Sequence, residues 1–121
     1  MSEPVLYHRH NLILPLPPNR ANSRWHWRTE QKLKAAYYLR CRAAAPPPRE
    51  PYERARIHAT FYLHNLMDHD NLAARMKWPQ DYLVKAGFIL EDDPAHLEWA
   101  GFPEQFIDRK DKRLVIELEP L

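Results

Sequence analysis

Glycine and cysteine are both scarce in this sequence. Only two of the 121 residues are glycines. Loops that wrap around nucleotide phosphates need several glycines close together, so folds that bind nucleotides through such loops are excluded. The single cysteine, Cys41, excludes an intrachain disulfide. Cys41 lies within a predicted helix, and we expect it to be a packing residue rather than a nucleophile.

Long apolar runs are absent as well. No apolar stretch approaches the roughly 20 residues that a membrane-spanning helix needs, and the first residues carry no signal-peptide pattern. The expected location is therefore the cytoplasm, with no membrane partner. A chain of this length suffices for one modest domain, so we expect residues 1–121 to form a single domain.

Charge is unevenly distributed, although the formal net charge is only +2. Acidic residues gather at positions 68–70 and 91–93. The segment from residue 20 to residue 42 has one acid, Glu30, and seven basic residues: Arg20, Arg24, Arg28, Lys32, Lys34, Arg40 and Arg42. Such a chain suits a protein that holds phosphates and places a cation among them.

The first half of the chain predicts a strand followed by a helix. Residues 5–16 are rich in Val, Leu and Ile and predict a strand, which a proline-rich turn ends. A helix is expected from about Thr29, and the prolines at 46–48 must stop it. Apolar residues at steps of three and four positions mark its buried side: Leu33, Ala36, Tyr37 and Cys41.

The second half predicts a strand, a helix and two further strands. Residues 57–64 alternate between apolar and polar, as a strand with one buried face does. A helix is expected over about 71–86, where Pro79 causes either a kink or a fresh start. Strands near 96–102 and at 113–118 follow. The prediction is an α+β fold, a small mixed sheet with two main helices in the order β-α-β-α-β-β.

The densest chemical signal is Asp68-His69-Asp70-Asn71-Leu72, where a strand gives way to a helix. Carboxylates this close repel one another unless a cation lies between them. Mg²⁺ and Mn²⁺ prefer oxygen ligands, and such an ion activates water and neutralises charge on a phosphodiester. A structural alternative stays open, in which the aspartates cap helix N–H groups.

Five separated motifs, in the same order, resemble the RusA family of Holliday junction resolvases. They are Leu14-Pro15-Leu16-Pro17-Pro18-Asn19, Asp68-x-Asp70-Asn71-Leu72, Lys77-x-x-x-Asp81-x-Leu83, Lys85-Ala86-Gly87-Phe88 leading into Asp92-Asp93, and Arg113-Leu114-Val115-Ile116-Glu117-Leu118. They match the family's opening strand with its Pro-Pro-Asn turn, its Asp-x-Asp-Asn motif, its central helix, its Asp-Asp pair and its closing strand.

The resemblance implies a structure-selective endodeoxyribonuclease that resolves Holliday junctions and other branched DNA in recombination and repair. The reaction would be Mg²⁺-dependent hydrolysis of a phosphodiester that leaves a 5′-phosphate, with Mn²⁺ as an alternative ion. A four-way junction is roughly two-fold symmetric, so a homodimer with one acidic site per subunit is expected. A bacterial or phage origin fits the family.

The resemblance also assigns the catalytic residues. Asp68, Asp70 and Asp93 would hold the metal ion, and a lysine on the central helix would stabilise charge on the scissile phosphate. Counted forward from the Asp-x-Asp-Asn motif, the lysine position falls on Ala74; counted back from the helix motif, it falls on Lys77. Since the two positions lie within about 60° around a helix axis, we choose Lys77. Arg75 is the rival for this role, although it lies about 100° from Ala74 in the other direction.

Arginines interleaved with aromatic residues predict a DNA-binding surface near residues 19–28. Trp25 and Trp27 would either stack on unpaired bases or anchor the helix start in the core. Residues expected to contact DNA, chiefly through its phosphates, are Arg20, Arg24, Arg28, Asn71 and Arg75.

Two other functions stay open. One is a catalytically inactive nucleic-acid-binding relative, in which the displaced lysine marks a decayed site. The other is a metal-dependent nuclease without junction preference. Retention of all three acids argues against decay, because clustered acids are costly without a cation.

Overall fold

Strand β2 (Ala55–Leu63) is the centre of the sheet in the computed structural model, which describes residues 10–19 and 26–121. Its residues alternate between buried and half-buried along the whole strand. Ile57, Ala59, Phe61 and Leu63 lie on the buried face, as the alternation predicts. The strand begins at Ala55, two residues earlier than expected.

The sheet is mixed, and its strands follow the order β1-β5-β2-β3. Strand β1 (His10–Leu14) pairs antiparallel with β5 (Arg113–Pro120), which pairs antiparallel with β2. On the other side of β2 lie two short parallel strands, one after the other. Strand β3 (Leu97–Trp99) pairs with the start of β2, and β4 (Glu104–Ile107) pairs with its end.

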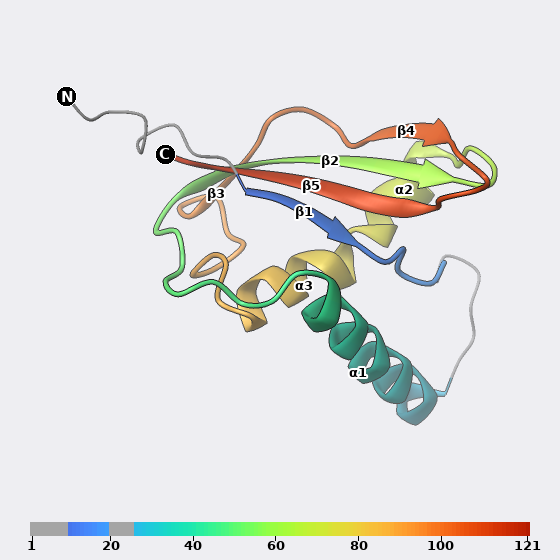
Figure 1. The fold of residues 1–121 in the computed structure, drawn as a ribbon, viewed down its shortest axis with the longest axis horizontal. Helices are drawn as coiled ribbons and strands as arrows, with labels where there is room; N and C mark the ends of the chain where they lie inside the picture. Colours follow the sequence, from blue (N-terminus) through green and yellow to red (C-terminus); the bar gives the residue numbers. More distant parts are fainter. Residues whose placement is uncertain (1–9, 20–25) are drawn as a thin grey trace.

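Three helices complete an α+β fold: α1 (Trp27–Ala44), α2 (His69–Arg75) and α3 (Lys77–Lys85). Figure 1 shows α1 and α3 on the same side of the sheet. The core lies between these helices and the buried face of the sheet, and it contains Leu12, Leu14, Tyr37, Phe61, Leu72, Leu83, Leu114, Ile116 and Leu118. The predicted fold class is confirmed, with one more short strand and one more helix than expected.

Helix α1 is less buried than its apolar spacing predicts. Tyr37 and Cys41 are its buried residues, whereas Leu33 is 37% exposed and Ala36 is exposed too. Figure 1 shows the reason, because α1 runs obliquely away from the sheet and its first turns lie beyond it. Burial raises the pKa of the Cys41 thiol to about 11, so the thiol stays protonated at neutral pH. This agrees with a packing role for Cys41.

The second expected helix is in fact two helices, separated at Met76. Pro79 is the third residue of α3, in its first turn. The first N–H groups of a helix have no intrahelical partner, so a proline costs little there. Of the two alternatives that Pro79 left open, the fresh start is correct.

The remaining differences concern the sheet's edge strands. The strand expected near residues 96–102 covers only Leu97–Trp99, and β4 was not expected. Glu104, Phe106 and Ile107 of β4 are all exposed, so no buried face gives the strand an alternating pattern. Residues 5–9 of the expected first strand lie outside the described residues.

A hydrogen bond from the core holds the proline-rich loop after β1. The hydroxyl of Tyr37 donates to the carbonyl oxygen of Pro15 at 2.9 Å. Prolines have no N–H group, so this loop can offer few backbone bonds of its own. Helix α1 therefore positions the loop through a side chain.

We expect Tyr37→Phe to lower the free energy of unfolding by about 0.5–1.5 kcal/mol, the usual net value of one such hydrogen bond. Urea unfolding measures this change. Tyr62→Phe is the matched control, because the Tyr62 ring contacts Phe106 and Arg113 on the open face of the sheet. A loss of stability as large in the control as in Tyr37→Phe would contradict the role of the Pro15 bond.

Candidate functional site

A pocket of about 400 Å³ lies where β2 ends and the chain turns into α2. Three segments far apart in the sequence meet there: the proline-rich loop, the β2–α2 connection with α2 itself, and the loop before β5. Its lining residues are Leu16, Asn19, Leu63, His64, Asn65, Leu66, Met67, Asp68, Asn71, Arg75 and Lys112.

Helix α2 turns three predicted site residues toward this pocket. Asp68, Asn71 and Arg75 are three and four positions apart, so they lie on one side of the helix. Asp68 is the N-cap residue, but its side chain makes no capping hydrogen bond. The capping alternative therefore does not apply to Asp68, and its exposed carboxylate is available to a ligand.

Arg75 joins the proline-rich loop to α2. Its Nε donates to the carbonyl oxygen of Pro17 at 2.8 Å, and its Nη1 lies 3.3 Å from the Met67 sulfur. Burial lowers the pKa of the Arg75 guanidinium, but an arginine stays charged at neutral pH. No carboxylate pairs with Arg75 in the described part of the chain, so its positive charge is available to the pocket.

Gln105 of β4 fixes the residue immediately before Asp68. Its side-chain oxygen accepts from the Met67 N–H at 2.8 Å, and its side-chain nitrogen donates to the Met67 carbonyl at 2.9 Å. The two bonds act like one more step of sheet pairing beyond the end of β2. Gln105 thereby sets the start of α2, and nothing in the sequence motifs pointed to it.

Lys112 brings a second cation to the pocket, from the loop between β4 and β5. That loop crosses the end of β2. There the Asp108 N–H donates to the Leu63 carbonyl oxygen at 2.9 Å, and the Arg109 Nε donates to the His64 carbonyl oxygen at 3.0 Å. Sequence reasoning missed Lys112. The signal that could have found it is the β2–β5 register, which pairs Tyr62 with Arg113 and so brings residue 112 beside the end of β2.

Asp93 lies at the other end of β2 from Asp68. It precedes β3, whose Leu97 pairs with Ala55 at the start of β2, whereas Asp68 follows Leu63 at its end. A strand of nine residues spans roughly 26 Å. Within one chain, the structure does not bring Asp93 to Asp68.

The Asp93 carboxylate has local partners instead. It lies 2.6 Å from the His96 ring nitrogen and accepts from the Ala95 and His96 N–H groups at 3.1 Å. The hydrogen bond with His96 holds the pKa of Asp93 below its usual value. Asp70 is exposed in the first turn of α2 and does not line the pocket. Across residues 10–19 and 26–121, no group of three or more His, Cys, Asp or Glu residues could hold a metal ion.

Two other predicted site residues, Lys77 and Arg28, do not line this pocket. Lys77 begins α3 beyond the break, its side chain is 67% exposed, and it does not line the pocket. Arg28 is exposed at the start of α1, with its guanidinium 5.3 Å from the exposed Trp27 ring. Trp27 therefore does not anchor the helix in the core. Arg20, Arg24 and Trp25 lie outside the described residues.

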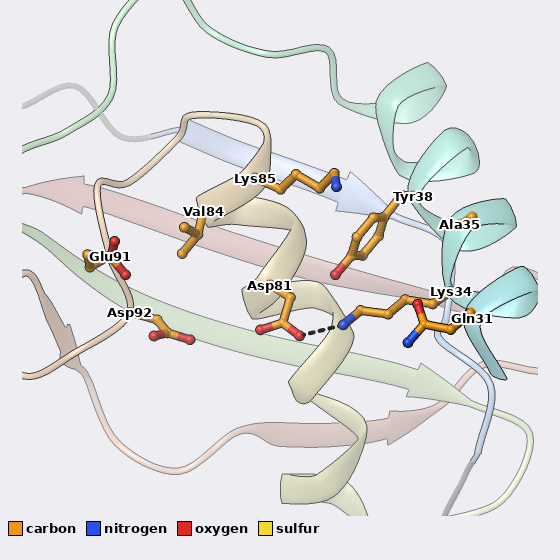
Figure 2. A pocket seen from close by; sticks show the side chains of 9 residues that line it. All are labelled: Gln31, Lys34, Ala35, Tyr38, Asp81, Val84, Lys85, Glu91 and Asp92. Carbon is orange, nitrogen blue, oxygen red and sulfur yellow. Dashed lines mark hydrogen bonds and ion pairs between the residues drawn. The ribbon is translucent and has the colours of Figure 1, made fainter. Parts of the chain in front are cut away.

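A second pocket, between α1 and α3, contains other parts of the same motifs (Figure 2). Lys34 donates to Asp81 at 3.0 Å across the two helices, so Asp81 ties α1 to α3. Lys85 lies 5.8 Å from the Tyr38 ring. Asp92 lines this pocket rather than the one at Asp68. Charges of both signs offset one another here, which favours a structural role.

No protein-family model matches the sequence, and no curated protein matches it either. The resemblance to the RusA family therefore rests on the motifs themselves. None of the described helices is long and apolar enough to cross a membrane.

If the pocket binds a DNA phosphate, Lys112→Ala will weaken DNA binding and flatten its dependence on salt. Each lost phosphate contact lowers the slope of log affinity against log salt by about one. Lys85→Ala is the control, since Lys85 is an exposed lysine of α3 that does not line this pocket. Titrations at several salt concentrations measure both slopes; equal slopes for Lys112→Ala and the unaltered protein would remove Lys112 from the site.

Proposed function

We propose that this protein is a structure-selective endodeoxyribonuclease that resolves Holliday junctions and other branched DNA by metal-dependent phosphodiester hydrolysis, in recombination and repair. One observation carries the proposal: the Asp68 carboxylate, which makes no capping hydrogen bond, shares a pocket with Asn71 and two cations, Arg75 and Lys112. A carboxylate binds a metal ion and cationic side chains bind a phosphodiester, so the pocket offers partners for both. The preference for branched DNA is proposed from the resemblance of the sequence motifs to the RusA family.

The donor set of the pocket fits Mg²⁺. This ion usually keeps several waters and binds through one or two carboxylates together with substrate phosphates. Asp68 would be one of those carboxylates. Asp70 does not line the pocket, so it would have to reach the ion from the first turn of the same helix. When bound, Mg²⁺ or Mn²⁺ would lower the pKa of a coordinated water and neutralise charge on the phosphate.

The cations would hold the substrate. Arg75 and Lys112 would bind phosphate oxygens, while the Asn71 amide would orient the nucleotide. In this proposal Lys112 takes the part that the resemblance assigns to a lysine of the central helix. The assignment to Lys77 stays a prediction, and it would require the exposed Lys77 side chain to reach around the helix.

The metal-ligand role that the resemblance assigns to Asp93 would require a homodimer. Since Asp93 and Asp68 lie at opposite ends of β2, they cannot share one ion within a chain. If Asp93 is a metal ligand, a second copy must supply it. Two such sites would be related by a two-fold axis, which matches the symmetry of a four-way junction. We propose this arrangement in the cytoplasm of a bacterium, or of one carrying a phage.

A second candidate, a catalytically inactive nucleic-acid-binding relative, is favoured by the distance between Asp93 and Asp68 and by the position of Lys77 outside the pocket. It would retain the pocket's cations for phosphates without holding a metal ion. A nuclease without junction preference would cut matched linear duplex equally well. Cleavage of synthetic four-way junctions and of linear duplex, with and without Mg²⁺, separates these possibilities.

Asp68→Asn should abolish junction cleavage while junction binding persists, because the change removes the charge that holds the ion but relieves repulsion of phosphates. The expected loss of rate is about 100-fold or more, typical for one preorganised group at a reacting centre. Glu53→Gln is the matched control, an exposed acid that lines neither this pocket nor any proposed site. Cleavage by Asp68→Asn at the unaltered rate would refute the proposed site.

Mixing two inactive variants tests the shared site. Asp68→Asn and Asp93→Asn should each be inactive alone, whereas a mixed dimer would have one intact site, built from Asp68 of one copy and Asp93 of the other. We expect nicking of one junction strand to return after the two variants are refolded together. If both variants are inactive and the mixture is too, the two aspartates do not act across a dimer.

A further inference from the structure

The edge of the sheet beside β2 is interrupted between β3 and β4. The Ala100 N–H donates to the Ile57 carbonyl at 2.9 Å, the last bond of this stretch, and pairing resumes at Glu104. Gly101 has a φ of +102°, a conformation that L side chains rarely adopt. The chain therefore leaves the sheet over residues 100–103 and approaches α2.

This excursion places Phe102 against α2 instead of in the core. Its ring centroid lies 4.9 Å from that of His69, and its side chain is 48% exposed. The core aromatics Trp78 and Phe88 are only 3% and 2% exposed. A large aromatic ring that is held in place yet half-exposed is available for stacking.

Phe102 borders a pocket of about 400 Å³ that is mostly apolar. The lining residues are Ala73, Met76, Gln80, Trp99, Gly101, Phe102 and Pro103. Two aromatic rings, Trp99 and Phe102, provide flat apolar surface, and the Gln80 amide provides both a donor and an acceptor. No charged side chain lines the pocket, so a phosphate is not its natural occupant.

Helix α2 lies between this apolar pocket and the pocket at Asp68. Ala73 lines the apolar pocket, and His69, one turn earlier on the same side of α2, supports the Phe102 ring. At about 100° per residue, this side lies roughly 150° around the helix axis from the side that carries Asp68, Asn71 and Arg75. The two pockets are thus about one helix width, ~10 Å, apart. A strand whose phosphate lies at Asp68 could therefore reach the apolar pocket with a nearby base.

We propose that this pocket, lined by Trp99, Phe102 and Gln80, binds an unpaired nucleobase at the branch point of the DNA. The inference rests on the proposed function and deepens it. Unpaired bases stack on aromatic side chains, and a glutamine amide can pair with a base edge. Bases within linear duplex are stacked and cannot enter such a pocket without being extruded. The pocket would therefore favour branched DNA over duplex.

The test measures DNA affinity without Mg²⁺, so that no strand is cut. Phe102→Ala should bind four-way junctions on the order of tenfold more weakly, the effect of removing one stacked ring, and should bind linear duplex unchanged. Phe106→Ala is the matched control, because Phe106 is 50% exposed but stacks on Tyr62 elsewhere on the sheet. An equal junction defect in both variants would overturn the proposal.

Abasic junctions identify the occupant. Removing the base that enters the pocket should weaken binding by the unaltered protein about as much as Phe102→Ala does, at one position next to the branch point. It should weaken Phe102→Ala no further, since the same contact is already lost. Additive losses at every position would show that the pocket holds no base. Sedimentation that shows a changed oligomeric state of Phe102→Ala would assign the pocket to a second copy and overturn the proposal.

The outcomes also separate this inference from the proposed function. If the unaltered protein prefers and cuts junctions but Phe102→Ala is unchanged, only the base pocket is refuted. If the unaltered protein neither prefers nor cuts branched DNA, the proposed function fails and the base pocket fails with it.

Discussion

The bond from Arg75 to the Pro17 carbonyl is the contact on which the candidate site depends. A loop rich in proline has few N–H groups with which to fix its own shape, so its carbonyls must be bound from outside. Arg75 binds one and Tyr37 binds another. Through these two side chains the loop is tied to α2 and to α1 at once. Two segments more than 40 residues apart thereby share one pocket.

The opposite wall of the pocket depends on the end of β2. Gln105 pairs with both backbone groups of Met67, and the loop carrying Lys112 is bonded to Leu63 and His64. The acid and the cation of the site are therefore positioned by the same strand end. A small protein gains precision in this way, because rigid sheet pairing, rather than free loops, sets the distance between the two charges.

The parts of the fold that the sequence predicts are those in which burial alternates. Strands β2 and β5 are buried on one face, so buried apolar residues recur at every second position along them. Strand β4 has exposed apolar side chains and no such pattern, and only its pairing with β2 defines it. Lys112 illustrates the same limit for the site. It becomes a neighbour of Asp68 through strand register, which local motifs do not encode, whereas Asn71 and Arg75 follow Asp68 at helical spacing.

The oblique course of α1 has a consequence for its stability. Its first turns cover little of the core, with Trp27 62% exposed and Leu33 37% exposed, while Cys41 is fully buried. Opening those first turns exposes almost no new apolar surface, so their hydrogen bonds break locally at low free energy. The hydrogen bonds around Cys41 break only when the core itself unfolds. Protection against solvent exchange is therefore graded along this single helix, from a readily frayed outer end to an end as stable as the whole domain.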